Sequence, residues 1–320
     1  MIHTSLRFAF FGTDDFSLTV LEELKKTGLV PVLIVTPPDR PKGRGLALTP
    51  PPAKLWALKN NIECFQPVVL DSSVTGQLSK VNGQLFIVAS YGLIIPKEIL
   101  EIPKHGTLNV HPSLLPKYRG ATPIENQILN DEKEVGVTIM LMDEETDHGP
   151  IVAQRQWENT KQRAQNPNKT QSTDIKKASE LRQMLAEEGG KLLGEVMPQW
   201  VTGKIKAIAQ DDSKATYTKK LIKADGEVHL SQDPYKNFLK ILAFQGSIGT
   251  YFFVFSSSPF QGEEPTCPES LRGSPRGRGV KKIRVIIKEA NFQNGKLILT
   301  RVVPEGKKEM SYEEFLRGLH

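Results

Sequence analysis

The chain has 320 residues, of which 38% are hydrophobic and 24% are charged, and its formal net charge is +6. This length fits two domains better than one, and the composition is that of a globular protein rather than a disordered chain. The two cysteines, Cys64 and Cys267, lie far apart, which excludes a disulfide framework and a zinc-type spacing. The sequence shows neither a secretory signal layout nor an apolar run of membrane-spanning length, so we expect a cytoplasmic protein without membrane contact.

Basic residues concentrate in the last third of the chain. Residues 1–202 carry 22 Lys and Arg against 23 Asp and Glu, whereas residues 203–320 carry 20 against 13. This asymmetry favours a polyanionic partner for the C-terminal part. A basic surface that is merely solvated is the alternative interpretation.

The first elements form a strand–helix–strand unit. The apolar run at residues 6–11 predicts a buried strand that stops at a tight turn at Gly12. Asp14 or Asp15 can cap the helix that follows, and residues 31–35 form a second apolar run. Such a unit, about thirty residues long, predicts two parallel strands joined by a right-handed crossover.

The alternation of helices and strands continues through residue 157. The pattern predicts helices at 53–60, 71–81 and 122–129, and strands at 62–65, 85–89, 107–111, 135–142 and 151–157. We therefore expect a doubly wound, Rossmann-like α/β domain, in which ligands bind beyond the carboxyl ends of the strands.

A second domain with a different pattern of secondary structure follows. A long helix at 174–202 leads to it, so we predict domains at residues 1–202 and 203–320. Short β-type runs at 250–255, 283–288 and 296–303, with helices at 233–243 and 311–319, predict a small β-barrel resembling an OB fold. Residues 256–282 are rich in Ser, Pro, Gly and Arg, which indicates a flexible excursion from that barrel.

Asn109 and His111 are the first candidate catalytic pair. Because side chains alternate along a strand, both lie on the same face of the strand at 107–111, near its carboxyl end. An amide and an imidazole side by side can donate hydrogen bonds to one developing oxyanion. The alternative is a structural histidine whose hydrogen bonds are satisfied in a strand–loop corner.

Asp147 is the candidate carboxylate partner of this pair. It lies in a turn that contains Gly149, between two predicted strands, and a carboxylate beside an imidazole can fix its tautomer or accept a proton. The neighbouring His148 competes with His111 for the catalytic role, and the residue pattern alone does not choose between them. The acidic run at residues 143–147 is equally typical of a solvated turn, which is the alternative interpretation.

The loop at residues 36–52 carries a candidate phosphate-binding group. It is long and rich in proline and glycine, and it presents Arg40, Lys42 and Arg44. Three cations on a shaped arm suit nucleic-acid phosphates, whereas a plain exposed connection is the alternative.

Taken together, these segments resemble the methionyl-tRNA formyltransferases of the folate-dependent formyltransferase superfamily. The resemblance is dense over residues 5–157 and thins in the last third to features such as Tyr217 and Ala243–Phe244. The matching motifs are Phe11-Gly12-Thr13 with Phe16, Pro38-Asp39-Arg40-Pro41, Gly43-Arg44-Gly45, Asn109-Val110-His111 through Pro116, Arg119-Gly120-Ala121 with Pro123-Ile124, residues 136–140, and Asp147 with Gly149.

The resemblance implies an enzyme that transfers the formyl group of 10-formyltetrahydrofolate to methionyl initiator tRNA, without a metal and as a monomer. It implies Asn109, His111 and Asp147 as the catalytic residues, with His148 as a neighbour. The residues that it assigns to tRNA are Arg40, Lys42 and Arg44. The residues that it assigns to the folate, largely through backbone groups, are Phe11, Gly12, Tyr91, Gly92, Leu93, Ile95, Ser113, Leu114, Leu115 and Pro116.

Three segments depart from the family pattern, namely Pro112, the stretch 245–249 in place of a proline-tryptophan stretch, and the excursion at 256–282. Three other functions compete with the main one. The first two are formylation of an amino-sugar nucleotide and hydrolysis of formyltetrahydrofolate, and the third is tRNA binding without catalysis. The arginine-bearing loop and the basic second domain favour the tRNA enzyme over the sugar enzyme. A hydrolase that resembles this family usually carries a regulatory domain ahead of the catalytic one, whereas here we expect the sheet to begin at Leu6. The intact catalytic residues favour the tRNA enzyme over the third alternative.

Overall fold

The computed structural model describes residues 6–42, 45–158, 175–256 and 281–319. The described residues fall into two compact units. The first contains the residues up to Pro123, Glu134–Glu158 and Glu180–Lys219; the second contains Ile124–Lys133, the residues just before Glu180, and the chain from Lys220 onward.

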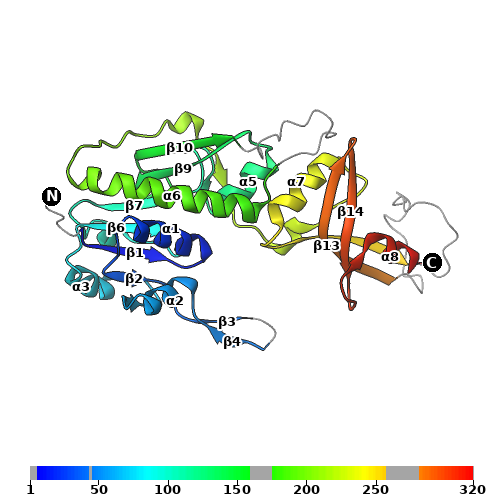
Figure 1. The fold of residues 1–320 in the computed structure, drawn as a ribbon, viewed down its shortest axis with the longest axis horizontal. Helices are drawn as coiled ribbons and strands as arrows, with labels where there is room; N and C mark the ends of the chain where they lie inside the picture. The colour runs from blue at the N-terminus through cyan, green and yellow to red at the C-terminus, as the bar shows by residue number, and fades with distance from the viewer. Residues whose placement is uncertain (1–5, 43–44, 159–174, 257–280, 320) are drawn as a thin grey trace. The chain divides into compact units, whose positions relative to one another are not determined.

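The first unit is built on a seven-stranded sheet of order β10-β9-β7-β6-β1-β2-β5 (Figure 1). Its strands are β1 (Phe8–Gly12), β2 (Leu33–Val35), β5 (Glu63–Phe65), β6 (Leu85–Ala89), β7 (Thr107–His111), β9 (Glu134–Leu141) and β10 (Ile151–Glu158). The five strands from β7 to β5 run parallel, and β9 and β10 extend the sheet antiparallel. The sequence predicted all seven strands and the doubly wound α/β class, and both predictions are confirmed.

Helices cover both faces of this sheet. On one face, α6 (Ala178–Val201) approaches α1 (Asp15–Lys26) and β7 through Gly189 and Gly190 (Figure 1). A Cβ at Gly189 would lie 2.7 Å from Cγ1 of Val110, and one at Gly190 would lie 2.6 Å from Cβ of Glu23. Glycine therefore lets the long helix pack closely against its neighbours.

The opposite face carries α3 (Ser72–Lys80) and α4 (Lys97–Leu100), which contact each other. Their apolar side chains join a buried cluster with the residues of β1 and β6 that point to this side, Ala9, Phe11, Phe86 and Val88. Strands buried on both faces read as continuous apolar runs, which is why these segments were visible in the sequence.

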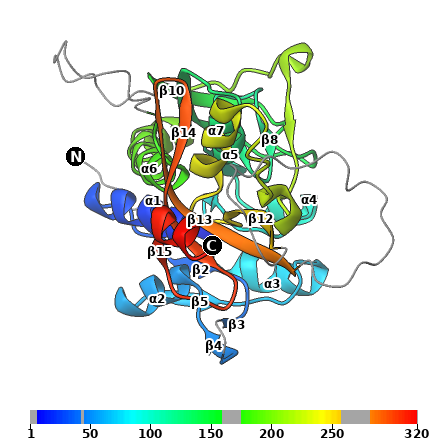
Figure 2. The ribbon, with the colours of Figure 1, turned by 90° about the vertical axis from the view of Figure 1, so that its right-hand side faces the viewer.

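Two short strand pairings of the first unit were not predicted. Within the long loop after β2, β3 (Arg40–Lys42) and β4 (Ala47–Thr49) pair antiparallel and lead to α2 (Pro52–Lys59) (Figure 2). β8 (Arg119–Gly120) pairs in parallel with β11 (Tyr217–Thr218). The second pairing joins distant parts of the sequence, so no local pattern could reveal it.

The second unit contains an antiparallel sheet of order β12-β13-β14-β15. Its elements are β12 (Thr250–Ser256), β13 (Lys281–Gln293), β14 (Lys296–Pro304), β15 (Met310–Ser311), α7 (Pro234–Phe244) and α8 (Tyr312–Arg317), while α5 (Pro123–Leu129) spans the boundary between the units. An apolar cluster that includes Ile241, Val285, Val302 and Phe315 fills its core. The antiparallel β domain is confirmed, and closure into a barrel stays a prediction. Most of the predicted excursion, residues 257–280, lies outside the described residues.

The domain boundary at residue 202 also stays a prediction. Past that point, Ile208 pairs with Ile151 and β11 pairs with β8, so residues up to Lys219 still contact the first unit. In the part of the chain that the structure describes, no helix is both long and apolar enough to cross a membrane.

Candidate active site

The carboxyl end of β7 presents Asn109 and His111 on one face of the strand. Both residues are buried, with exposed residue fractions of 9% and 4%. β6 on one side and β9 on the other hold β7 in register, and Asn109 pairs with Val88 and Met140. The alternation of side chains thus brings the amide and the imidazole together as the sequence predicted.

Asp147 meets both of them from the turn that follows β9. Its Oδ1 accepts a long hydrogen bond from Nδ2 of Asn109 at 3.4 Å, and its Oδ2 lies 3.6 Å from Nδ1 of His111. The backbone N–H of Gly120 donates to the same Oδ2 at 2.7 Å. Asp147 has a φ of 49°, a left-handed conformation that non-glycine residues adopt at a cost and that often marks a functional site.

The other ring nitrogen of His111 is already engaged. Nε2 lies 3.0 Å from the carbonyl oxygen of Tyr118, which can only accept a hydrogen bond. Nε2 therefore carries a proton, and Nδ1 is the ring atom that faces Asp147. A protonated His111 can donate from Nδ1, as an oxyanion stabiliser must.

His148 lies in a different environment. Its Nδ1 contacts Oδ2 of Asp143 at 2.7 Å, and its Nε2 lies 3.5 Å from Oδ2 of Asp212. The side chain is 35% exposed, whereas that of His111 is 5% exposed. Of the two histidine side chains, only that of His111 lies near the Asp147 carboxylate among the described residues, which favours His111 as the catalytic one.

The ion pair of His148 should make the stability of the protein depend on pH. The hydrogen bond that His148 donates to the Asp143 carboxylate raises the pKa of His148 above its usual range, and the negative charges of Glu145 and Asp212 raise it further. A raised pKa in the folded state means that the stabilisation is complete below the unfolded pKa of about 6.5 and is lost as the pH rises through the folded value. We expect His148→Gln to lower the free energy of unfolding by less than about 1 kcal/mol at pH 6, because the pair is exposed. Thermal unfolding from pH 6 to 9 should show the stability difference between wild type and His148→Gln shrink as the pH rises. The kcat of this variant should stay within about threefold of wild type. A loss of catalytic activity would make His148 the catalytic histidine.

The loop after β6 has backbone N–H groups that are available to a ligand. Gly92 has a φ of 79° and is exposed, and Ile94 is 91% exposed. Within the described residues, the N–H groups of Gly92, Leu93 and Ile94 donate to no protein group. Tyr91 is 3% exposed and its hydroxyl is a buried group without a partner among the described residues. Free amides beside apolar side chains fit a flat heterocycle with polar edges.

The turn at the start of α1 supports that loop. Oγ1 of Thr13 donates to the carbonyl of Tyr91 at 2.7 Å, and the ring of Phe11 packs edge-on against the ring of Tyr91 at 5.4 Å. Gly12 is required because a Cβ there would lie 2.6 Å from the Phe10 ring. Phe11 and Gly12 therefore shape the loop from behind. Direct contact with folate stays a prediction for these two residues, as it does for Tyr91, Gly92, Leu93 and Ile95.

The second predicted folate loop, Ser113 to Pro116, uses most of its polar groups internally. Oγ1 of Thr138 donates to the carbonyl of Ser113 and accepts from the N–H of Leu115 at 2.6 and 3.1 Å. Nε2 of Gln154 donates to the carbonyl of Leu115 at 2.8 Å, and the N–H of Thr216 donates to that of Pro116 at 3.2 Å. The side chain of Leu114 packs against Gly136, where a Cβ would overlap it. The loop is thus rigid, and its predicted backbone contacts with folate stay a prediction.

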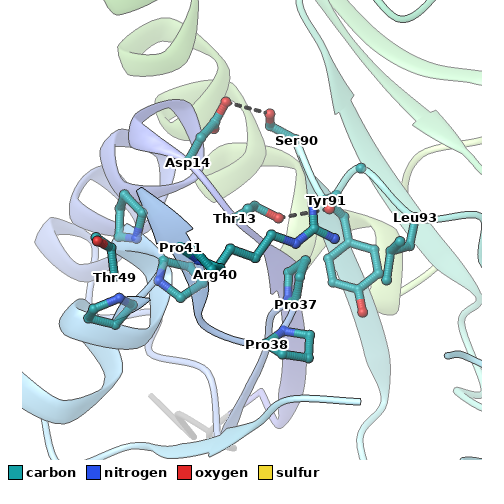
Figure 3. A pocket seen from close by; sticks show the side chains of 14 residues that line it. Thr13, Asp14, Pro37, Pro38, Arg40, Pro41, Thr49, Ser90, Tyr91 and Leu93 are labelled. Carbon is teal, nitrogen blue, oxygen red and sulfur yellow. Dashed lines mark hydrogen bonds between the residues drawn. The ribbon is translucent and has the colours of Figure 1, made fainter. Parts of the chain in front are cut away.

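A cavity of about 390 Å³ opens beside the loop after β6 (Figure 3). Thr13, Asp14, Ser90, Tyr91, Gly92 and Leu93 line it on one side, and the proline-rich segments around Arg40 and Thr49 on the other. Figure 3 shows the Arg40 side chain extending across the cavity toward Tyr91. Arg40 is exposed and has no ion-pair partner within the described residues. The side chain of Lys42 and the whole of Arg44 lie outside what the structure describes, so their predicted role stays a prediction.

Asp39 fixes the base of this arm, a role that the sequence interpretation missed. Nζ of Lys54 lies 2.8 Å from its Oδ2, and Nε2 of Gln66 donates to its Oδ1 and to the carbonyl of Pro37, both at 2.9 Å. These hydrogen bonds lower the pKa of Asp39 below its usual range. Arg40 is therefore presented by an anchored segment.

Among the described residues, no three His, Cys, Asp or Glu side chains gather as a metal site requires.

The geometry defines an open α/β sheet with an amide, an imidazole and a carboxylate meeting at the end of one strand. The sequence model of the formyl transferase family matches residues 6–177, and this chain belongs to that family. A solved structure of a methionyl-tRNA formyltransferase from Clostridium thermocellum shares the fold, with a TM-score of 0.52 at 14% identity over 96% of this chain and 99% of that one.

Curated relatives identify the branch of the family. The chain is 37% identical to the methionyl-tRNA formyltransferase of Dictyoglomus thermophilum, over 98% of this chain and 97% of the relative. It is 34% identical to the Bacillus subtilis methionyl-tRNA formyltransferase, over 98% and 95%. The match extends through the second unit as well, so the chain is a member of the methionyl-tRNA formyltransferases.

Proposed function

We propose that the protein transfers the formyl group of 10-formyltetrahydrofolate to the amino group of methionine on initiator tRNA. The resulting formylmethionyl-tRNA would serve translation initiation. Relatives that match almost the whole chain are named methionyl-tRNA formyltransferases, which supports an aminoacyl-tRNA acceptor. The observation that carries the choice of reaction centre is the contact of one carboxylate, that of Asp147, with both Asn109 and His111.

The three side chains divide the chemistry between them. As the amine adds to the formyl carbon, negative charge develops on the formyl oxygen, and Nδ2 of Asn109 and Nδ1 of a protonated His111 donate hydrogen bonds to it. The bond from the formyl carbon to N10 of the folate breaks, and one proton passes from the amine to N10. Asp147 orients both donors and carries that proton. The folate supplies the formyl carbon in an activated amide.

The free amides of Gly92, Leu93 and Ile94 support a folate site beside this centre, since a pterin ring offers both donors and acceptors along its edge. The exposed Arg40 supports an approach of the tRNA acceptor end from the side of the proline-lined cavity. The excess of 20 basic over 13 acidic residues in positions 203–320 supports a second contact with tRNA. We place the enzyme in the cytoplasm as a monomer.

A comparison of three acceptors tests the proposal. The purified protein would be given 10-formyltetrahydrofolate with methionyl initiator tRNA, with an amino-sugar nucleotide, or with water alone, and the formylated product would be followed on acid gels or by chromatography. We expect formylation of the tRNA alone, with methionyl elongator tRNA as a poor substrate. Transfer to the sugar, or release of free formate at a comparable rate, would overturn the proposal.

The predicted role of Arg40 can be measured separately. We expect Arg40→Ala to weaken tRNA binding and to reduce the salt dependence of log K by about one unit, because one phosphate contact and its counterion release are lost. Filter binding between 50 and 300 mM salt measures both effects. Arg7→Ala removes the same charge at the amino end of β1, where Arg7 donates to the carbonyl of Val81, and serves as the control. Equal losses in the two variants would contradict a specific role for Arg40.

A further inference from the structure

One amide side chain, that of Gln210, holds the turn that carries Asp147. Its Nε2 donates to the carbonyl oxygens of Asp147 and Gly149 at 2.8 and 2.7 Å. These two bonds lie on either side of His148 and so fix both ends of the turn. Because the left-handed backbone of Asp147 is costly, the turn needs such support to persist.

Arg119 in turn fixes the orientation of this amide. Nε and Nη2 of Arg119 donate to Oε1 of Gln210 at 3.1 and 2.9 Å, and Nη1 donates to the hydroxyl of Tyr217 at 3.1 Å. The Arg119 side chain is only 1% exposed. A guanidinium can only donate, so the amide oxygen must face Arg119 and the amide nitrogen must face the turn.

Gly120, which follows Arg119, contacts the side-chain carboxylate of Asp147. The N–H of Gly120 donates to Oδ2 of Asp147 at 2.7 Å, while Gln210 holds the main chain of the same residue. The contacts of Asp147 with Asn109 and His111, at 3.4 and 3.6 Å, are long, so a small rotation of the carboxylate would break them. Catalytic rates respond steeply to such displacements.

We propose that Gln210 is a positioning residue for formyl transfer, which together with Arg119 aims the Asp147 carboxylate at His111 and Asn109. The inference rests on the proposed role of Asp147 in that reaction. Gln210 needs no contact with either substrate. Arg119 and Gly120 thereby gain a role, whereas in the sequence they stood out only as a motif shared with the family.

Gln210→Glu is the sharpest test, because it keeps an oxygen for Arg119 but replaces the donor to the two carbonyls by a second acceptor. We expect kcat to fall about 10- to 100-fold, with the KM values for 10-formyltetrahydrofolate and methionyl initiator tRNA within about threefold. In a protein that already carries Asp147→Asn, Gln210→Glu should lower kcat by less than about threefold further. A residue that acts through Asp147 loses its effect once Asp147 is altered. Gln210→Ala, which leaves room for water at each carbonyl, should show the same coupling.

Asn60→Asp is the matched control. Asn60 also accepts from a cation, Nζ of Lys25 at 2.6 Å, and donates to a backbone carbonyl, that of Trp56 at 2.8 Å. This variant should lose some thermal stability at unchanged kcat. A kcat for Gln210→Glu within about twofold of wild type, or an equal loss with and without Asp147, would overturn the proposal. Wild-type turnover in the same assay tests the proposed function independently of this inference.

Discussion

Replacing Asp147 with asparagine should lower kcat for formyl transfer by about 10²- to 10⁴-fold, the range typical of a lost general acid–base group. An asparagine cannot carry the proton, and one of its two terminal atoms becomes a donor that opposes either Nδ2 of Asn109 or the N–H of Gly120. The KM values for both substrates should stay within about threefold, because neither is bound through this carboxylate in the proposed mechanism. Steady-state kinetics with methionyl initiator tRNA measures both quantities.

Asp143→Asn supplies the control for this experiment. Asp143 lies on the same turn, and its replacement removes the same charge, but within the described residues its side chain contacts His148 and the N–H of Glu145. We expect kcat close to that of wild type. A loss of less than tenfold in Asp147→Asn, or a similar loss in both variants, would contradict the assignment of the carboxylate.

Gly149→Ala should destabilise the protein by about 3–5 kcal/mol, the upper range for a single substitution. A Cβ at this position would overlap the carbonyl oxygen of Leu141 and lie 3.2 Å from Cε of Met140. Backbone atoms of a central sheet cannot move aside cheaply, so the turn that carries Asp147 must shift. We therefore expect a lower midpoint in urea and thermal unfolding together with a fall in kcat.

Gly76→Ala is the contrasting variant. Gly76 lies inside α3, is exposed, and has no atom within 4 Å of the position that a Cβ would take. Alanine is favoured over glycine in a helix interior, so this change should stabilise the protein by about 0.5–1 kcal/mol. If Gly149→Ala were as stable as wild type, the close approach between the turn and β9 would be wrong.

The large elements of the fold could be predicted because each leaves a local pattern. The strand at residues 107–111 is a buried apolar run, and side-chain alternation places Asn109 and His111 together without any knowledge of the rest of the chain. The β3–β4 hairpin was missed because prolines and glycines hide its short strands. Helix α4 was missed because it has only four residues.

The partners of the site were harder to predict because they are distant in sequence. Asp147 contacts Asn109 from 38 positions away; the pattern made it only a candidate beside a possible solvated turn, and the family resemblance implied its catalytic role. Gln210 reaches Asp147 across 63 positions and Arg119 across 91, from a segment that looks like an ordinary polar linker. A lone glutamine in such a linker carries no signal of its own. Its role follows only from the three-dimensional contacts that orient its amide.

The most direct test is a crystal structure of the protein with 5-formyltetrahydrofolate, a stable analogue of the donor. We predict that its ring packs against the loop from Tyr91 to Ile95. The N10 edge should then point at Nδ2 of Asn109 and Nδ1 of His111, leaving space for a formyl oxygen at about 2.7–3.2 Å from both donors. An analogue bound elsewhere, with these two atoms facing no part of it, would contradict the proposed reaction centre.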